Sequence, residues 1–197
     1  SSAASDVYKR QVFFAYRGYR MNYYAVTAML ARVYCWAGEY GNAYKEAKEV
    51  VDATYSTGST STASCFNFSN SLTTNRKDYN SIIMTFFKST CYEDYLPYMT
   101  KGNDVVLVVN TTNLFGDEAG ADDRNLDLFG DWDGGDIKYS FKYDIKEGTS
   151  GTDMIPAIRL SEMYYIMGEY FAYKDEFSKA GEMLDKVRYA RAISTTN

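Results

Sequence analysis

The sequence predicts a mainly α-helical fold in which two helical hairpins, one near each end, flank a loop-rich insertion with short β-strands. Three observations predict it: helical periodicity near both ends, superposition of the two periodic segments, and a change to polar loops and alternating residues between them. We expect one domain over residues 12–197, with the first hairpin at 12–55, the insertion at 56–154 and the second hairpin at 155–197.

The first hairpin is predicted from Met21 to about Ala53. Small and apolar side chains recur at helical spacing and form one stripe, made of Tyr24, Thr27, Ala28, Leu30, Ala31, Tyr34 and Cys35. Gly38 breaks this run, and 39–41 is expected to be the turn. The next helix is amphipathic, with Ala43, Ala47, Val50 and Val51 on its inner face and Lys45, Glu46, Lys48 and Glu49 on its outer face.

The second hairpin is predicted from Pro156 to about Ala192. Proline suits the first turn of a helix, because its missing N–H would have no partner within the helix there. The first stripe consists of Ile158, Tyr164, Met167, Gly168 and Phe171. Residues 174–176 are expected to form the turn. The last helix carries Ala180, Leu184, Val187, Ala190 and Arg191.

The two hairpins superpose at an offset of 137 residues without a gap. The matched pairs are Leu30 with Met167, Ala31 with Gly168, Tyr34 with Phe171, Tyr40 with Phe177, Ala43 with Ala180 and Val50 with Val187. This order of large, small, aromatic and alanine positions is the tetratricopeptide spacing. Small residues allow two helices to cross closely, and the aromatic residue fills the groove beside the crossing.

The insertion has a different character. Residues 54–74 are rich in Ser, Thr, Asn and Gly, and we expect an exposed loop there. Short strands are predicted at 81–87, 104–110 and 137–145, the last from its alternation of apolar and polar residues. Between the last two lies an Asp- and Gly-rich stretch, 116–136. Loops held by a rigid scaffold commonly carry binding, so function is expected here.

Composition excludes several classes of protein. The formal net charge of −5 and the absence of long Lys/Arg runs disfavour nucleic-acid binding. The chain contains no His, which removes His-dependent catalytic triads and the usual zinc sites. Its 3 Cys lack metal-ligand spacing, and the odd count disfavours a disulfide framework. The chain is rich in aromatic residues, with 20 Tyr, 11 Phe and 2 Trp. Such a content is typical of partly solvated binding surfaces and also of packed helix faces.

No apolar stretch is long enough for a transmembrane helix. Residues 1–11 lack the hydrophobic segment of a signal peptide and share no pattern with the rest of the chain, so we interpret them as a non-native lead-in. The chain is expected to be a fragment of a longer protein.

The segment 131–136 resembles an oxygen-rich calcium loop. Gly135 and Lys142 stand at two of the positions where an EF-hand needs oxygen ligands, so a solvated turn is the preferred interpretation. This region contains four carboxylates, Asp122, Asp123, Asp127 and Asp131, and two of them could form the catalytic pair of a glycoside hydrolase. Nothing in the sequence places two of them face to face, and catalysis is not expected.

Trp132 stands among carboxylates and glycines, an environment that suits stacking on a sugar ring. Packing of this indole against the core is an equal alternative. The expected ligand contacts are Trp132, Asp131, Asp133 and Tyr139, an aromatic and acidic set that favours a neutral, hydroxyl-rich ligand. Arg159 and Glu162 lie one helical turn apart; an ion pair within the scaffold, or a hydrogen bond to the insertion, is preferred over a ligand clamp.

Several segments resemble SusD/RagB-like nutrient-uptake proteins. They are the run Arg20–Tyr34 with Ala37–Tyr40 and the Ala43/Ala47 pair, the signature-like run Ile155–Ile166, the closing helix Leu184–Arg191, and the ordered motifs Asp122–Arg124 and Lys142–Tyr143. The resemblance covers about residues 20–192. Gly168 and Asp185 depart mildly from the family pattern, which usually has Ala and Asn at these positions.

The resemblance implies a lipid-anchored protein on the outer face of a Bacteroidetes outer membrane, with the anchor outside this sequence. Such a protein captures glycans or peptides for a SusC-like TonB-dependent transporter. It is not an enzyme and needs no cofactor or metal. Two alternatives stay open: a tetratricopeptide adaptor that binds a peptide or protein in its groove, and, ranked last, a glycoside hydrolase.

Overall fold

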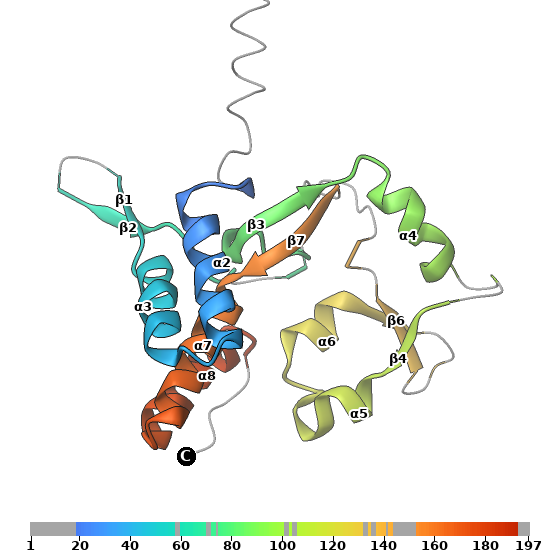
Figure 1. Ribbon diagram of the computed structural model, residues 1–197. Helices are drawn as coiled ribbons and strands as arrows, with labels where there is room; N and C mark the ends of the chain where they lie inside the picture. Colours follow the sequence, from blue (N-terminus) through green and yellow to red (C-terminus); the bar gives the residue numbers. More distant parts are fainter. Residues whose placement is uncertain are drawn as a thin grey trace, which may run out of the picture.

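The computed structural model describes residues 19–57, 60–69, 72–73, 75–100, 103, 106–131, 134, 137–140, 142–143 and 153–192. Helices α2, α3, α7 and α8 gather on one side of the molecule together with the β1–β2 pair, whereas α4, α5, α6 and the sheet that contains β4 and β6 lie on the other side (Figure 1). The β3–β7 pair lies between the two sides. The mainly α-helical fold with hairpins flanking an insertion is therefore confirmed.

The 137-residue repeat appears directly in the helix boundaries. The first hairpin is α2 (Tyr23–Trp36) with α3 (Tyr40–Val51), and the second is α7 (Leu160–Tyr173) with α8 (Phe177–Tyr189). Both turns contain a residue with positive φ at equivalent positions, 76° at Gly38 and 59° at Asp175. The glycine adopts this left-handed conformation without steric cost, and Asp tolerates it better than most residues.

The second hairpin begins later than predicted. Pro156 lies in strand β7 (Met154–Arg159), which pairs antiparallel with β3 (Ile82–Phe87), and helix α7 starts only at Leu160. The expectation of a helix from Pro156 was wrong, because proline fixes φ at a value that also suits an extended strand. Pairing with β3, which lies far away in the sequence, selects the extended strand over the helix at Pro156.

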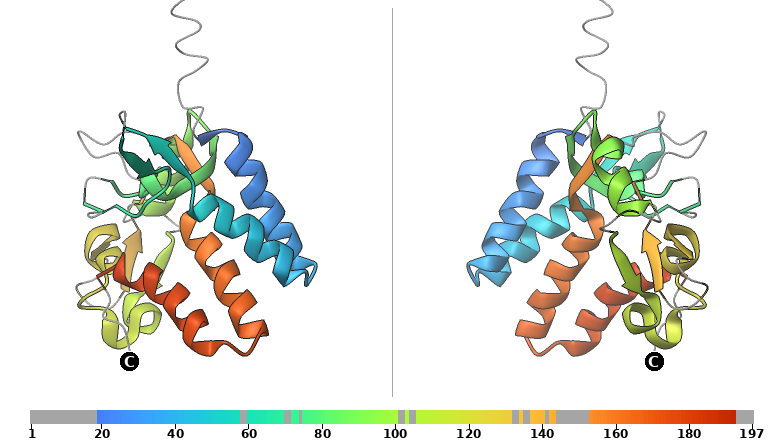
Figure 2. Two further views of the ribbon diagram at one scale, coloured as in Figure 1. Left: turned by 90° about the vertical axis from the view of Figure 1, so that its left-hand side faces the viewer. Right: turned by 90° about the vertical axis from the view of Figure 1, so that its right-hand side faces the viewer.

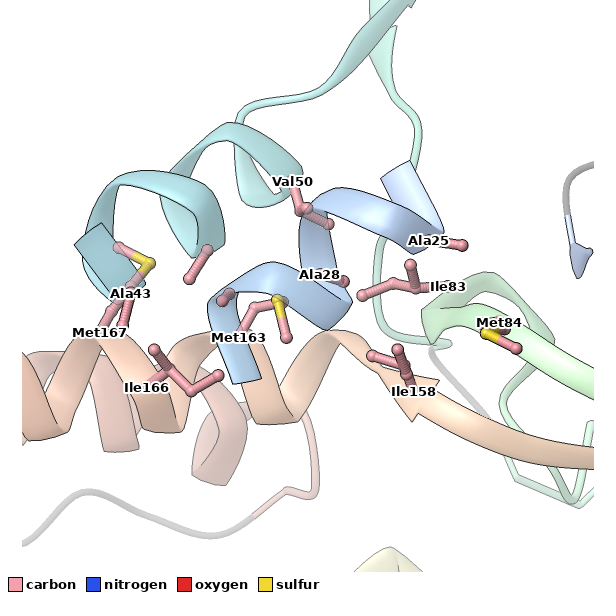
Figure 3. Packing of buried hydrophobic residues seen from close by; sticks show 12 residues of the cluster. Ala25, Ala28, Ala43, Val50, Ile83, Met84, Ile158, Met163, Ile166 and Met167 are labelled. Atoms are coloured by element: carbon pink, nitrogen blue, oxygen red, sulfur yellow. The ribbon is translucent and has the colours of Figure 1, made fainter. Parts of the chain in front are cut away.

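The hydrophobic core forms where α7 packs across the first hairpin. The small residues Ala28, Ala31, Ala43 and Ala47 have no exposed surface and let the helices approach closely. Figure 3 shows Met163, Ile166 and Met167 of α7 directed toward this surface, with Ile83 and Ile158 of the β3–β7 pair extending the cluster. The core therefore joins both hairpins and the adjoining strands.

Polar contacts also join these elements. Arg32 on α2 donates to both carboxylate oxygens of Glu162 on α7, at 2.5 and 2.7 Å, and to the carbonyl of Ala157 at 2.8 Å. Arg159 donates to the carbonyl of Lys77 in the insertion at 2.6 Å. Glu162 thus forms an ion pair within the scaffold, and Arg159 forms a hydrogen bond to the insertion.

The insertion contains more regular structure than predicted. Residues 54–64, expected as loop, include the antiparallel pair β1 (Thr54–Ser56) and β2 (Thr62–Ser64). The expected strand at 81–87 is confirmed as β3. A separate three-stranded sheet has the order β4-β6-β5, with β4 at Val108–Asn110, β6 at Ile137–Ser140 and β5 at Phe129–Asp131.

Short helices in the insertion were not predicted. They are α4 (Cys91–Met99), α5 (Thr111–Phe115), α6 (Asp123–Leu128) and the single 3-10 turns η2 (Tyr79–Ser81) and η3 (Gly116–Glu118). Each of α5 and α6 starts at a side-chain cap, with Asn110 accepting from the Asn113 N–H and Asp122 accepting from the Arg124 N–H. Within the described ranges, no helix has the length and apolar character needed to cross a membrane.

Candidate ligand pocket

A cavity of about 300 Å³ lies where α5 and α6 meet the sheet β4-β6-β5. It is larger than two other cavities among the described residues, of about 270 and 210 Å³. Its lining consists of Leu114, Phe115, Arg124, Leu128, Phe129, Ser140 and Lys142. A few polar groups among apolar walls are typical of small-molecule sites.

Two aromatic rings form part of the apolar wall. Phe115 at the end of α5 and Phe129 at the start of β5 meet edge to face, with ring centroids 5.9 Å apart. The guanidinium of Arg124 lies over the Phe115 ring, 5.4 Å from its centroid. The Phe115 ring therefore contacts both a second ring and a cation, and these contacts favour one orientation of the ring beside the cavity.

Arg124 is held in place by a buried carboxylate. Asp122 at the start of α6 is almost fully buried, and it accepts from the Nε of Arg124 at 2.9 Å and from its Nη2 at 2.5 Å. This hydrogen-bonded carboxylate raises the pKa of Arg124, so the guanidinium stays charged. Because the pair is neutral overall, Arg124 contributes directed donors to the pocket but little net charge.

Lys142 supplies the net charge of the pocket. Its pKa is lowered to about 8, chiefly by burial and also by the nearby positive charges of Arg159, Arg191 and Lys77. Asp78 opposes this effect, yet no carboxylate within the described part of the chain forms an ion pair with Lys142. An incoming anion would therefore meet an ammonium group whose charge is not already neutralised by contact.

A second cavity, of about 210 Å³, shares Arg124 with the first. Its other lining residues come from α7, α8 and the residues after α8, namely Tyr165, Leu184, Val187, Arg188 and Arg191. Arg191 forms an ion pair with Asp78 at 3.2 Å, and its other terminal nitrogen is buried without a hydrogen-bond partner. The second hairpin thus places cationic side chains close to the insertion.

The predicted ligand contacts Asp131 and Tyr139 lie on neighbouring strands of the sheet but on opposite faces. In the antiparallel register of β5 and β6, Asp131 lies opposite Lys138 and Tyr139 lies opposite Gly130. Because side chains alternate along a strand, Asp131 shares the face of Phe129 and the pocket. Tyr139 lies on the other face, with its ring against Gly130, where an added Cβ would stand 2.8 Å from the ring.

Trp132 and Asp133, the other predicted contacts, fall outside the described residues. The ligand-binding role of all four residues stays a prediction. Asp133, Gly135 and Asp136 of the calcium-like segment fall outside as well. Among the described residues, no group of three or more His, Cys, Asp or Glu side chains could hold a metal ion.

The pocket was not predicted as a site, although two of its motifs were noticed. Asp122–Arg124 and Lys142–Tyr143 stood in the order of the family resemblance, and the structure brings Arg124 and Lys142 to one cavity. No sequence signal marked Phe115 or Phe129, because each is an ordinary apolar residue at the end of a short element.

The comparisons with known proteins concern fold. No family model matches the chain, and no curated protein matches it in sequence. Among solved structures, it is similar to a SusD-like carbohydrate binding protein from Bacteroides vulgatus, with a TM-score of 0.59, 16% identity, and coverage of 91% of this chain and 39% of that one.

Two further solved structures show the same likeness. A SusD superfamily protein from Bacteroides thetaiotaomicron has a TM-score of 0.60 and 20% identity, covering 88% of this chain and 43% of that one. A SusD-like protein from Bacteroides fragilis has a TM-score of 0.59 and 13% identity, with 93% and 49% covered. The chain thus spans less than half the length of these proteins, and the SusD-like resemblance is confirmed as a likeness of fold.

Proposed function

Because the chain has the SusD-like fold, we propose that it binds carbohydrate and does not transform it. In the proposed role, it captures glycan at the outer face of the outer membrane for a SusC-like TonB-dependent transporter. Its membrane attachment would be a lipid anchor carried outside this sequence. Among the solved structures of similar fold, one is described as a SusD-like carbohydrate binding protein and another as a putative sugar binding protein, which supports the carbohydrate part of the proposal.

The observation that carries the proposal is the pairing of rings and hydrogen-bond donors in the pocket between α5, α6 and the sheet. The Phe115 and Phe129 rings offer apolar surface to the C–H face of a pyranose. Arg124, Ser140 and Lys142 place polar groups around the same cavity, where they can bond to sugar hydroxyls. A volume of about 300 Å³ suits one or two sugar rings of a longer chain.

The charge of this pocket favours an acidic sugar. Arg124 is neutralised by Asp122, whereas the ammonium of Lys142 is not paired with a carboxylate of the described residues. A carboxylate or sulfate group on the sugar would supply the missing negative charge. This differs from the neutral ligand expected from the acidic loop sequence, because the sequence did not show that Lys142 lines the cavity.

The sequence-predicted contacts also form part of this proposal. Asp131 follows Phe129 by two residues on the same face of β5, and Trp132 and Asp133 come directly after it in the chain. We propose that these residues extend recognition beyond the cavity. Tyr139, on the other face, would contact only a ligand that wraps around the edge of the sheet.

The test is oligosaccharide binding measured by an array and by calorimetry, with neutral and uronic-acid ligands compared. Phe115→Ala should weaken binding of both ligand types by about tenfold or more, whereas Lys142→Met should weaken only the acidic ones. Tyr55→Ala, which removes an exposed ring on β1, serves as the matched control and should change neither. If the folded Phe115→Ala and Lys142→Met proteins bind every ligand as the wild type does, the pocket is not the site.

The transporter part needs its own experiment. Affinity purification of the protein from outer membranes of its source organism should bring down a TonB-dependent transporter in stoichiometric amount. Recovery without such a transporter would contradict the partnership and leave carbohydrate binding unaffected.

A further inference from the structure

The segment Lys77–Asp78 is a meeting point of cationic side chains from distant parts of the chain. Arg159, the last residue of β7, donates to the carbonyl of Lys77 at 2.6 Å. Arg191, which follows α8, donates to the carboxylate of Asp78 at 3.2 Å. Lys77 and Asp78 are almost fully buried, at 1% and 2% exposed, so these contacts lie in the interior of the protein.

Lys142 joins this meeting point through its neighbour in the chain. The ammonium of Lys77 lies over the ring of Tyr143, 4.6 Å from the ring centroid. The positive charges of Arg159 and Arg191 also act on Lys142 and contribute to lowering its pKa, as expected for charges that lie close together. Lys142, Arg159 and Arg191, here called the cationic trio, therefore converge on one region of the interior.

Two members of the cationic trio have unused hydrogen-bond donors. The Nη2 of Arg159 and the Nη1 of Arg191 are buried, and neither has a hydrogen-bond partner in the described part of the chain. Arg191 as a whole is only 8% exposed. A buried donor without an acceptor is costly, so these two nitrogens favour a ligand that brings acceptor oxygens.

The charges around the cationic trio are unbalanced. Asp78 forms the ion pair with Arg191, and it also accepts from the backbone N–H of Ser69 at 2.8 Å. Asp123 is near enough to Arg191 for that charge to oppose the rise in the pKa of Asp123, but within the described ranges it forms no ion pair with the cationic trio. Three cations thus share one paired carboxylate, and a further negative charge would offset their mutual repulsion.

The cationic trio lies beside two cavities that share Arg124 in their lining. Lys142 lines the cavity of about 300 Å³, and Arg191 lines the one of about 210 Å³. Figure 2 shows the last turn of α8 reaching the insertion, where the N–H of Asp123 donates to the carbonyl of Arg191 at 3.2 Å. These cavities give an anion room next to the cationic trio.

We propose that Lys142, Arg159 and Arg191 bind an oxyanion, that is, a sulfate, phosphate or carboxylate group. One ammonium and two planar guanidinium groups offer donors from several directions, and an oxyanion offers several acceptor oxygens in return. The oxyanion is either a free ion or the acidic group of a sugar that enters the cavity lined by Lys142. The second source rests on the proposed carbohydrate binding, whereas the first does not.

The experiment measures the unfolding temperature of the whole chain at pH 7, where Lys142 is mostly charged, in a buffer without phosphate. Sodium sulfate, a uronic-acid oligosaccharide and a neutral oligosaccharide are titrated at millimolar concentrations, with the ionic strength held constant by sodium chloride. A ligand that binds only the folded chain should raise the unfolding temperature by about 3 °C or more at tenfold excess over its dissociation constant.

Two variants test the cationic trio. Lys142→Met removes one charge at similar side-chain length, and Arg191→Lys keeps a cation beside Asp78 but loses the planar fork of donors. In each, at least about tenfold more sulfate should be needed for the same shift in unfolding temperature. Lys45→Met, which changes an exposed lysine on α3, is the matched control and should keep the full shift. Circular dichroism checks folding, and Lys142→Gln replaces Lys142→Met if the latter unfolds.

The outcomes separate the two sources. A sulfate shift that both variants lose supports the cationic trio with a free ion as a sufficient ligand, and a shift caused only by the uronic-acid oligosaccharide, lost in the same variants, supports it with the sugar as the source. No shift from either ligand, or an equal shift in the wild type and both variants as in a general salt effect, overturns the proposal. If the neutral oligosaccharide still binds in that case, carbohydrate binding stands and only the oxyanion site is refuted.

Discussion

Gly168 offers a direct test of how closely the two helices of the second hairpin approach. It lies inside α7, at the position where the first hairpin has Ala31. A Cβ added there would meet the carbonyl oxygen of Ala180 and the Cβ of Met183, both at 3.7 Å, which is ordinary van der Waals contact. Alanine therefore fits without displacement of α8.

The expected effect of Gly168→Ala is stabilisation by about 1 kcal/mol. Alanine is favoured over glycine in a helix interior by about that amount, because glycine loses more backbone entropy on folding. The new methyl group adds contacts without strain. For a chain of this size, such a gain raises the unfolding temperature by about 2–4 °C.

Urea unfolding followed by circular dichroism measures this change in the free energy of unfolding. Gly181→Ala on α8 is the matched control, because its added Cβ would have no neighbour within 4 Å and tests helix propensity alone. Gly168→Ala should stabilise at least as much as Gly181→Ala. A loss of stability in Gly168→Ala together with a gain in Gly181→Ala would show that α7 and α8 lie closer than described, and would refute the reasoning.

Three further predictions concern other parts of the molecule. Gly130→Ala should destabilise the fold by about 1 kcal/mol in urea unfolding, because its Cβ would stand 2.8 Å from the Tyr139 ring and force it to move; an unchanged midpoint would contradict this geometry. Glu162→Gln should cost about 1 kcal/mol by weakening the ion pair to Arg32, and a loss that did not shrink in high salt would argue against an electrostatic cause. Lys142→Met should stabilise the protein most below pH 8, where the wild-type folded state carries a partly buried charge. The pKa of Lys142 is about 8 when folded, against 10.5 as the ordinary value, so the folded wild type loses this proton first and the advantage of Met should shrink as pH rises from 8 to 10.5.

The sequence by itself determined the helical hairpins. Their period, their glycine and aspartate turns and the 137-residue offset are local properties, and the observed helices begin at equivalent residues, Tyr23 and Leu160, and Tyr40 and Phe177. Periodic apolar faces of this length specify a helix wherever they pack. The SusD-like fold could therefore be predicted from residues that lie close together in the chain.

Strand pairing was decided by distant residues. Pro156 suits a helix start or a strand equally well, and only the antiparallel pairing of β7 with β3, which places Pro156 opposite Thr85, makes it part of a strand. The short helices α5 and α6 have five and six residues, too few for a periodic pattern to be recognised. Their existence depends on side-chain caps and on the sheet beside them.

The candidate pocket was decided by tertiary structure alone. Phe115, Arg124, Phe129 and Lys142 come from three different elements and the residues after β6, and no spacing in the sequence connects them. The charge of a chain with net −5 gave no reason to expect a cationic cavity. Folding brought Arg159, Arg191 and Lys77 near Lys142, and burial made its charge costly. A local pattern can specify a helix, whereas the electrostatics of a pocket depend on which distant side chains the fold brings together.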